Sequence, residues 1–561
     1  MFSNFRLSMA WAHTWFGLVL GFVLMECFFF GALSVFDQEI DRWAIPVTRF
    51  SRQHIPSFDQ RLRPTLEALQ PGRESLQALR SQAVTPPPQH FDVVRNWSVS
   101  ATHRDPMLDV YATWEVPGAM NAGDDAWVSC SLDPRTGAAL PDDRLRIGSR
   151  FFYPMHYGLH LEWKGLGYWI AGLAALVMLV TLVSGVILHR RIFREFFTFR
   201  PKKAMQRSVL DLHNLTGVLA VPFHFFFAFT GLMIFAGIYF PIAETQLKPL
   251  HDQYEQFEAQ QTSLPRQRAG VAAPLASVDA MVVQARHRWA ARGVGGEVGL
   301  LELRHVGDVN GTVSVFRAST DRVALVGEGI HFKASTGELL YEDPPRTAVD
   351  SVHTFLTGLH LAPFRHWLLR WLYLLGGLMG CACIATGFIF FVGKRKRQHA
   401  KVDRLGVCAV DALAVTTVTG MLIATLAILI ANRLLPDALP VGWPLRSQLE
   451  IGAFWGSWTL AMLHAFMRSA PVAQGRTNPA WREQCWAVGG MAITTVLLNW
   501  VTTGDHLIRT VSDGYWPVAG VDLFLLASAA LALMAARKLK TKPEPQTMDA
   551  TRSKRAEAAN A

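Results

Sequence analysis

The sequence lacks the short motifs by which many redox and transport proteins hold a cofactor or a nucleotide. It contains no C-x-x-C-H motif for covalent haem attachment, no P-loop, and no G-x-G-x-x-G behind a strand. These absences exclude a covalently attached haem and a built-in nucleotide site of these types. Any electrons that the chain handles must therefore come from a separate donor, which the sequence does not identify.

The sequence is also poor in cysteine, with six residues in 561. Only Cys130 lies in a polar region, and the others lie in or at the ends of apolar stretches. No disulfide framework or set of zinc ligands can be drawn from this pattern. The pair Cys381-Ala-Cys383 is more typical of close helix packing by small residues than of a redox site.

Positive charge is plentiful, with a formal net charge of +10, but it is not spread along the chain. It gathers in three short blocks directly after apolar runs. The blocks are Arg190, Arg191, Arg194, Arg200, Lys202, Lys203 and Arg207; then Lys394, Arg395, Lys396 and Arg397; then Arg537, Lys538, Lys540 and Lys542. Such blocks mark the cytoplasmic ends of membrane spans, so the partner is a lipid bilayer and not nucleic acid.

Long apolar runs therefore define the architecture, and 50% of the residues are hydrophobic. We predict a polytopic α-helical membrane protein with about eight transmembrane helices. The first four spans are 1–37, 161–189, 209–240 and 361–393; polar α+β domains on the outer side are 38–160 and 241–360; cytoplasmic loops are 190–208 and 394–407; four additional spans lie within 408–540; and a disordered cytoplasmic tail is 541–561. With this count every basic block falls on the cytoplasmic side.

An internal repeat relates the two halves of the first 400 residues. At an offset of 200 residues, His13-x3-Gly17-x13-Gly31 matches His213-x3-Gly217-x13-Gly231, Thr136-Gly137 matches Thr336-Gly337, and Gly158-Leu159-His160 matches Gly358-Leu359-His360. Ser184-Gly185 matches Thr386-Gly387 after a further shift of two. The repeat predicts a duplicated helix–(α+β domain)–helix core.

Histidines in apolar surroundings are the candidate site residues, because an imidazole that faces lipid is costly and such a residue usually marks a site. The repeat brings His13 toward His213 on the inner side and His160 toward His360 on the outer side, as duplicated halves commonly pack about a pseudo-two-fold axis. Facing histidine pairs are a recurrent way to hold a b-type haem. We therefore expect two haems b, whose irons are bound by these four histidines.

Other residues compete for the outer ligand positions. His224 lies 11 positions after His213, about 20° around and about 16 Å along an ideal helix, so both would face one side. His156 and His353 share helix faces with His160 and His360 and are alternative ligands or plain interfacial residues. Glu26, deep in the first span, is a possible proton or charge site. For any single histidine, the simplest alternative is a structural role in which its side chain forms a hydrogen bond between helices.

The chain resembles the PepSY-associated transmembrane helix family over roughly residues 1–400. The stretches that carry the resemblance are MHYGLHLEWKGLGYW, DLHNLTGVLAVPFHFFFAFTG, VHTFLTGLHLAPFRHW, LDPRTGAAL and KASTGELL. The resemblance implies an inner-membrane protein of Gram-negative bacteria with two PepSY domains in the periplasm. It also implies haem-containing relatives that reduce ferric siderophores so that iron is released as Fe(II).

Three functions from different classes are therefore open. The leading hypothesis is a di-haem oxidoreductase that passes electrons across the bilayer to a ferric siderophore or another ferric chelate at the periplasmic face. The second is a proton-coupled transporter that uses Glu26 and the histidines as a proton relay. The third is a non-catalytic membrane protein whose PepSY domains bind peptides or regulate envelope proteins. An optical spectrum distinguishes the first function from the other two.

Overall fold

The computed structural model describes most of the chain. The described residues are 2–50, 55–72, 75–76, 94–101, 106–115, 126–141, 144–188, 205–240, 246, 248–250, 252–253, 264–319, 322–325, 327–399, 404–437, 439–440, 443–474 and 476–539. The predicted basic loop 190–208 lies outside them except for its last four residues. The predicted tail 541–561 lies wholly outside them, as do Lys540 and Lys542 of the third basic block.

The described residues include five helices that are long and apolar enough to cross a membrane. They are Trp163–Leu188, Trp367–Lys394, Leu405–Leu434, Ala480–Thr503 and Trp516–Lys538. Two bent pairs, Phe5–Val19 with Gly21–Ser34 and Gln206–Leu219 with Val221–Ile234, bend by 62° and 61° and raise the number to seven if each is one span. The chain is therefore a multi-pass helical membrane protein. Its predicted count of about eight spans stays a prediction, because α18 (Arg446–Met467) mixes charged and apolar residues and is not among these candidates.

The chain forms two compact units, each of which takes segments from both halves of the predicted repeat. The first unit comprises Met1–Phe30, Val180–Pro222 and Gly377–Ala561, and the second comprises Gly31–Leu179 and Phe223–Gly376. The two longest helices of the core, α7 (Leu166–Leu188) and α15 (Trp367–His399), contribute to both units.

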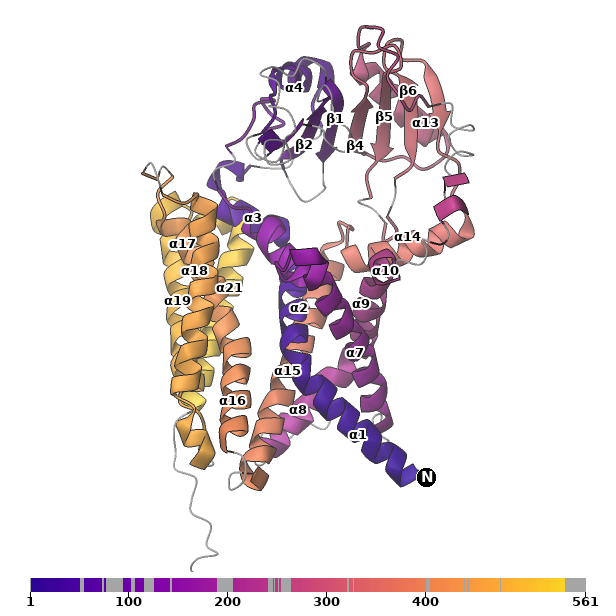
Figure 1. Ribbon diagram of the computed structural model, residues 1–561. Coiled ribbons are helices and arrows are strands. Elements are labelled where there is room, and N and C mark those ends of the chain that lie inside the picture. Colours follow the sequence, from indigo (N-terminus) through magenta and orange to yellow (C-terminus); the bar gives the residue numbers. More distant parts are fainter. Residues whose placement is uncertain are drawn as a thin grey trace, which may run out of the picture. The chain divides into compact units, whose positions relative to one another are not determined.

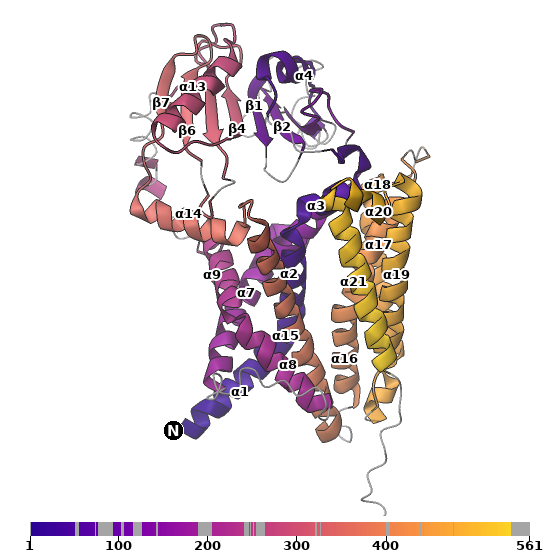
Figure 2. The same cartoon turned by 180° about the vertical axis from the view of Figure 1, so that it is seen from behind.

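The first unit is entirely helical in its described part. It contains α1 (Phe2–Val19), most of α2 (Gly21–Ser34), α8 (Met205–Leu219), α16 (Arg404–Val415), η5 (Thr416–Gly420), α17 (Met421–Leu434), α18, η6 (Ala470–Gln474), α19 (Ala480–Thr503), α20 (Leu507–Ser512) and α21 (Trp516–Lys538). The helices α17, α18, α19 and α21 lie side by side, as Figure 1 shows, and α20 leads into α21 in the opposite view of Figure 2.

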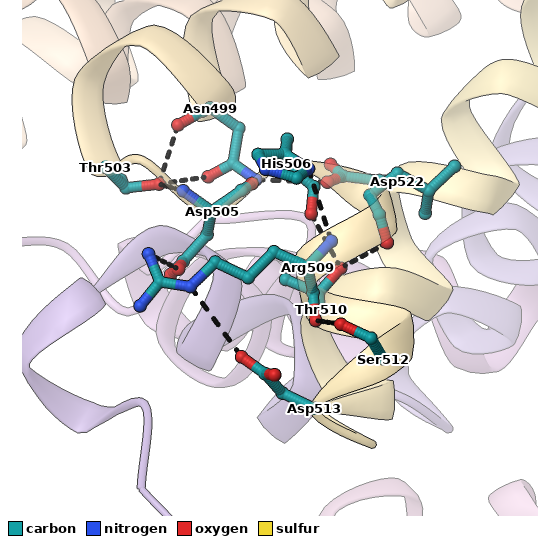
Figure 3. Close-up of polar contacts among 10 residues, drawn as sticks. Asn499, Thr503, Asp505, His506, Arg509, Thr510, Ser512, Asp513 and Asp522 are labelled. Carbon is teal, nitrogen blue, oxygen red and sulfur yellow. Dashed lines mark hydrogen bonds and ion pairs between the residues drawn. The ribbon is translucent and has the colours of Figure 1, made fainter.

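These four neighbouring helices bury polar side chains between them. The Asn499 amide donates to the Asp522 carboxylate over 3.1 Å, and both residues are at most 1% exposed (Figure 3). At the junction of α17 and α18, the Asn432 amide donates to the Glu450 carboxylate over 2.9 Å. Hydrogen bonds between spans fix the register of neighbouring helices, since a buried polar group must find a partner there.

The second unit combines membrane helices with a β-sheet. Its helical segments are α3 (Asp37–Ala44), η1 (Pro46–Thr48), η2 (Phe58–Leu62), α4 (Arg63–Ala68), η3 (Ile147–Phe152), α6 (Tyr153–Gly158), η4 (Trp163–Gly165), most of α9 (Val221–Ile234), α10 (Ala236–Tyr239), α13 (Val278–Ala291) and α14 (Ala348–Leu361). Its strands are β1 (Val94–Ala101), β2 (Leu108–Trp114), β3 (Ala126–Leu132), β4 (Val298–Arg304), β5 (Thr312–Arg317), β6 (Gly329–Lys333) and β7 (Leu339–Glu342).

The seven strands form one sheet, which joins the polar regions predicted as domains at 38–160 and 241–360. The strand order is β3-β2-β1-β4-β5-β6-β7, and the antiparallel pairing of β1 with β4 joins the two polar regions. Alternating residues such as Trp97, Val99, Leu301 and Leu303 are buried on one face, where they form a core with Trp289 of α13. An unpaired strand edge leaves backbone hydrogen bonds unmade, so pairing the first strand of each region satisfies both edges.

Two helices that pack on this sheet, η2 and α13, meet at their N-termini, and each caps the other. The Asp279 carboxylate accepts hydrogen bonds from the Ser57 hydroxyl (2.5 Å) and from the N–H of Asp59 (3.3 Å). The Asp59 carboxylate in turn accepts from the Ser277 hydroxyl (2.7 Å) and from the N–H of Asp279 (3.1 Å). Each helix therefore supplies the negative charge that the other helix favours at its N-terminus.

We expect Asp59→Ala to loosen the start of α13, although Asp59 belongs to the other polar region. Loss of a capping side chain costs about 0.5–2 kcal/mol, so local hydrogen exchange there should accelerate roughly 2- to 30-fold. Exchange measured by mass spectrometry on the full-length protein in detergent checks this. The matched control is Glu67→Ala, whose exposed carboxylate pairs only with Arg63 of its own helix among the described contacts. Equal exchange in the two variants would show that the reciprocal caps contribute nothing.

Candidate functional site

Two histidines from different halves of the chain lie face to edge in the first unit. His13 is on α1 and His213 is on α8, and their ring centroids are 6.2 Å apart with an interplanar angle of 83°. Both rings are partly buried among apolar helices. The structure thus brings together the two residues that the repeat predicts as the inner pair.

A backbone carbonyl orients each of these rings. The Nδ1 of His13 lies 3.0 Å from the carbonyl oxygen of Thr181 and 3.2 Å from the Ser184 hydroxyl. The Nδ1 of His213 lies 2.8 Å from the carbonyl oxygen of Cys383. Because a carbonyl only accepts hydrogen bonds, Nδ1 carries the proton in each neutral ring and Nε2 carries the lone pair. This tautomer is the one that metal-ligating histidines adopt when a second contact fixes the ring.

A glycine of a neighbouring helix leaves room for each ring. A Cβ atom added at Gly185 of α7 would lie 3.3 Å from the His13 ring, and one added at Gly387 of α15 would lie 3.3 Å from the His213 ring. Both distances are tighter than an ordinary van der Waals contact. The matched Ser184-Gly185 and Thr386-Gly387 pairs therefore have a steric role at this site.

A second histidine pair lies in the second unit. His156 of α6 and His360 of α14 have ring centroids 6.0 Å apart and an interplanar angle of 27°. Glycines again accommodate the rings, because a Cβ atom at Gly31 would lie 2.6 Å from the His156 ring and one at Gly231 would lie 3.0 Å from the His360 ring. The His360 Nδ1 lies 2.9 Å from the Thr230 hydroxyl.

The electrostatic environment keeps His360 neutral. Burial, together with the neighbouring His156, lowers the pKa of His360 to about 3. At neutral pH the imidazole is therefore uncharged, and the neutral ring is the form that binds a metal ion.

The structure does not bring His160 to His360, although the repeat predicts that pair. The Nε2 of His160 donates to the Phe151 carbonyl over 2.9 Å, and its ring stacks on the Phe151 ring at 4.7 Å. The reason is local. Gly358-Leu359-His360 lies within α14, whereas α6 ends at Gly158 and the next two residues adopt left-handed φ angles of 52° and 51°. The two tripeptides are identical in sequence but differ in backbone conformation, so their histidine side chains point in different directions. His156, and not His160, therefore lies next to His360.

The remaining candidates lie in three different surroundings. His224 is fully buried on α9, the helix that also carries Thr230 and Gly231, and it faces the backbone of Gly376. His353 is exposed on α14, and Glu26 is half-buried on α2. Their predicted roles as an alternative ligand and as a proton site stay predictions.

The spacing of both histidine pairs fits a haem iron held between two imidazoles. With metal–nitrogen bonds of about 2.0–2.1 Å, two axial imidazoles would have ring centroids about 6.3 Å apart. The observed separations are 6.2 Å and 6.0 Å. A Cβ atom at Gly17, one turn after His13, would meet no atom within 4 Å, whereas one at the matching Gly217 would lie 3.3 Å from the Cys383 Sγ.

Sequence reasoning missed several residues that contact the rings. Cys383 was assigned to helix packing, but its Sγ lies 3.5 Å from the His213 Nδ1 and its carbonyl orients that ring. Thr230 and the carbonyl of Thr181 were not singled out. The glycine contacts could have been found, since Gly31, Gly231, Gly185 and Gly387 are all part of the repeat.

Comparison with known proteins identifies a relative that aligns with about two thirds of this chain. An uncharacterised protein of Pseudomonas aeruginosa is 26% identical over 385 residues, which is 65% of this chain and 88% of the relative. The sequence pattern of the PepSY-associated TM region matches residues 10–394, and this range includes all four paired histidines. This chain belongs to the PepSY-associated TM region family.

Proposed function

We propose that the protein is a transmembrane oxidoreductase that holds two haems b and reduces ferric siderophores or other ferric chelates at the periplasmic face of the inner membrane. The observation that carries the proposal is the recurrence of one arrangement in both units. In each unit, two histidines from different halves of the chain lie about 6 Å apart, and each ring rests against a glycine of a neighbouring helix.

The arrangement also supports a duplicated core with both halves contributing to each site. The inner pair takes one histidine from α1 and its equivalent from α8, and the strand order of the sheet is symmetric about the β1–β4 pair except for β7, which has no counterpart among the described strands. Together with the basic blocks, this favours about eight spans with both polar regions in the periplasm. The electron donor would then reach the inner pair from the cytoplasmic side.

The residues present would do three things at these sites. Nε2 of each histidine would bind iron, and the contacts at Nδ1 of His13, His213 and His360 would fix the tautomer and the ring plane. The glycines would keep the helices close enough for both rings to reach one iron. Haem, when bound, supplies a one-electron carrier. A ferric siderophore is too large and polar to enter the bundle, so His156 and His360 would hold the carrier from which the chelate is reduced.

An absorbance spectrum of the purified full-length protein tests the proposal. We expect a reduced-minus-oxidised difference spectrum of a low-spin b-type haem and about two haems per chain by pyridine haemochrome, because two pairs of histidines lie about 6 Å apart and each pair would hold one haem. A protein expressed with sufficient haem that shows no haem absorbance would refute the proposal. The transporter and the PepSY binding module would then be the functions to test.

A further inference from the structure

The helix α14 is amphipathic along its whole length. Thr347 caps its N-terminus by accepting from the N–H of Asp350 over 3.2 Å, and the helix ends at Leu361. At 100° per residue, its apolar side chains fall on one face, and its polar side chains fall on the other. The apolar face comprises Val349, Val352, Phe355, Leu356 and Leu359; the polar face comprises Asp350, Ser351, Thr354 and Thr357.

The C-terminal half of α14 is fixed to the membrane helices of its own unit. Leu359 packs in an apolar cluster with Phe364 and Tyr373, and its carbonyl accepts from the Tyr373 hydroxyl over 2.6 Å. His360 lies on the same face, against His156 and next to Gly231 of α9. The apolar face of α14 is therefore the face that points toward the spans.

The N-terminal half of α14 extends beyond these contacts with the same face uncovered. Val349 is 78% exposed, Val352 is 59% exposed and Phe355 is 46% exposed. Figures 1 and 2 both show α14 lying crosswise over the ends of α9 and α15. The axes of α9 and α15 follow the direction of the spans, and the axis of α14 crosses that direction. The apolar face of α14 therefore extends beyond α9 and α15, at the level where these two helices end.

The surroundings of this face are those of a membrane surface. Five residues separate the end of α14 from the span Trp367–Lys394, whose first residues, Trp367 and Leu368, are 65% and 57% exposed. A tryptophan exposed at the end of a span is typical of the membrane–water interface. A crosswise amphipathic helix joined to a span at this depth is typical of an interfacial helix.

We propose that the N-terminal half of α14 lies in the bilayer interface, with Val349, Val352 and Phe355 inserted among lipid chains just below the headgroups. The partner of this surface is the lipid bilayer. Because His360 is on the same helix, the bilayer would also restrain the position of that ring. The proposal concerns the helix alone and does not depend on haem binding.

A fluorescent unnatural amino acid placed at Val352 tests the proposal without touching the native cysteines. The matched control carries the same fluorophore at Ser351, the adjacent residue on the opposite face. The full-length protein is placed in lipid nanodiscs, and each site is titrated with lipids brominated on the acyl chain and with aqueous iodide. We expect bromolipid to quench position 352 more strongly than position 351, and iodide to show the reverse order.

Two results would overturn the proposal. Equal iodide quenching at both positions, with no bromolipid effect, would show that the face is open to water. Protection of position 352 from both quenchers would show that protein, such as a second copy of the chain, covers it. The quenching readout does not involve haem, so a failure here is distinguishable from a failure of the proposed function.

Discussion

Replacing His156 by alanine is expected to remove one of the two proposed haems and to bring the proposed ferric-chelate reduction to background, whereas His160→Ala should retain both haems. The His156 ring lies 6.0 Å from the His360 ring, but His160 is turned away and donates to the carbonyl of Phe151. An iron that loses one of two axial ligands loses half of its protein bonds, so His360→Ala should give the same loss as His156→Ala. Haem per chain and the rate of Fe(II) release by the full-length protein are the measurements.

The competing assignments predict other patterns for this set of variants. Loss of the haem in His160→Ala but not in His156→Ala would restore the pairing that the repeat suggests. Loss in His224→Ala alone would assign the ligand to α9, in which His224 is fully buried. Thr230→Val should weaken haem binding without abolishing it, by about 10- to 100-fold, as is usual for a residue that orients a ligand.

His13→Ala and His213→Ala are expected to remove the same spectral component, and the component that remains should be the one that His156→Ala removes. The two rings lie 6.2 Å apart in the first unit and are oriented by separate carbonyls, so they would bind one iron from its two sides. Low-temperature difference spectra and redox titration of purified variants separate the two components. Loss of different components in the two variants would refute the pairing.

Two further variants make this second prediction specific. Gly387→Leu should reduce occupancy of the inner haem although it leaves both histidines in place, because even a Cβ atom there would lie 3.3 Å from the His213 ring. His464→Ala is the matched control, since this histidine lies on α18 of the same unit and pairs with Glu483 at 3.0 Å. An unchanged spectrum in His464→Ala would show that losing a histidine from a helix of this unit is not by itself disruptive.

The inner pair could be predicted from the sequence because its surroundings repeat. His13 and His213 both lie in the interior of a helix, so a fixed offset in sequence places them equivalently in space. The outer pair could not, because the repeat is broken locally. A helix that ends at Gly158 in one half continues to Leu361 in the other, and periodicity carries no information about a helix that has ended.

Prediction of the sheet from the sequence is limited in a similar way. The strands were expected from their composition and turns, but the pairing of β1 with β4 joins residues such as Val99 and Leu301, which are far apart in sequence. Which strand edge meets which is decided by long-range packing and not by local pattern. The contacts of Cys383 and Thr230 with the histidine rings also depend on how helices cross, so residue type alone did not reveal them.

The joined sheet has a consequence for how the protein is made. Strand β1 is synthesised long before β4, because two predicted spans and the loop between them separate the two polar regions. Until β4 arrives, the edge of β1 is an unpaired strand that can pair with another chain. Contacts between residues so distant in sequence also form slowly. The first polar region therefore lacks one strand partner during this part of synthesis, and its unpaired edge is a site at which aggregation can begin.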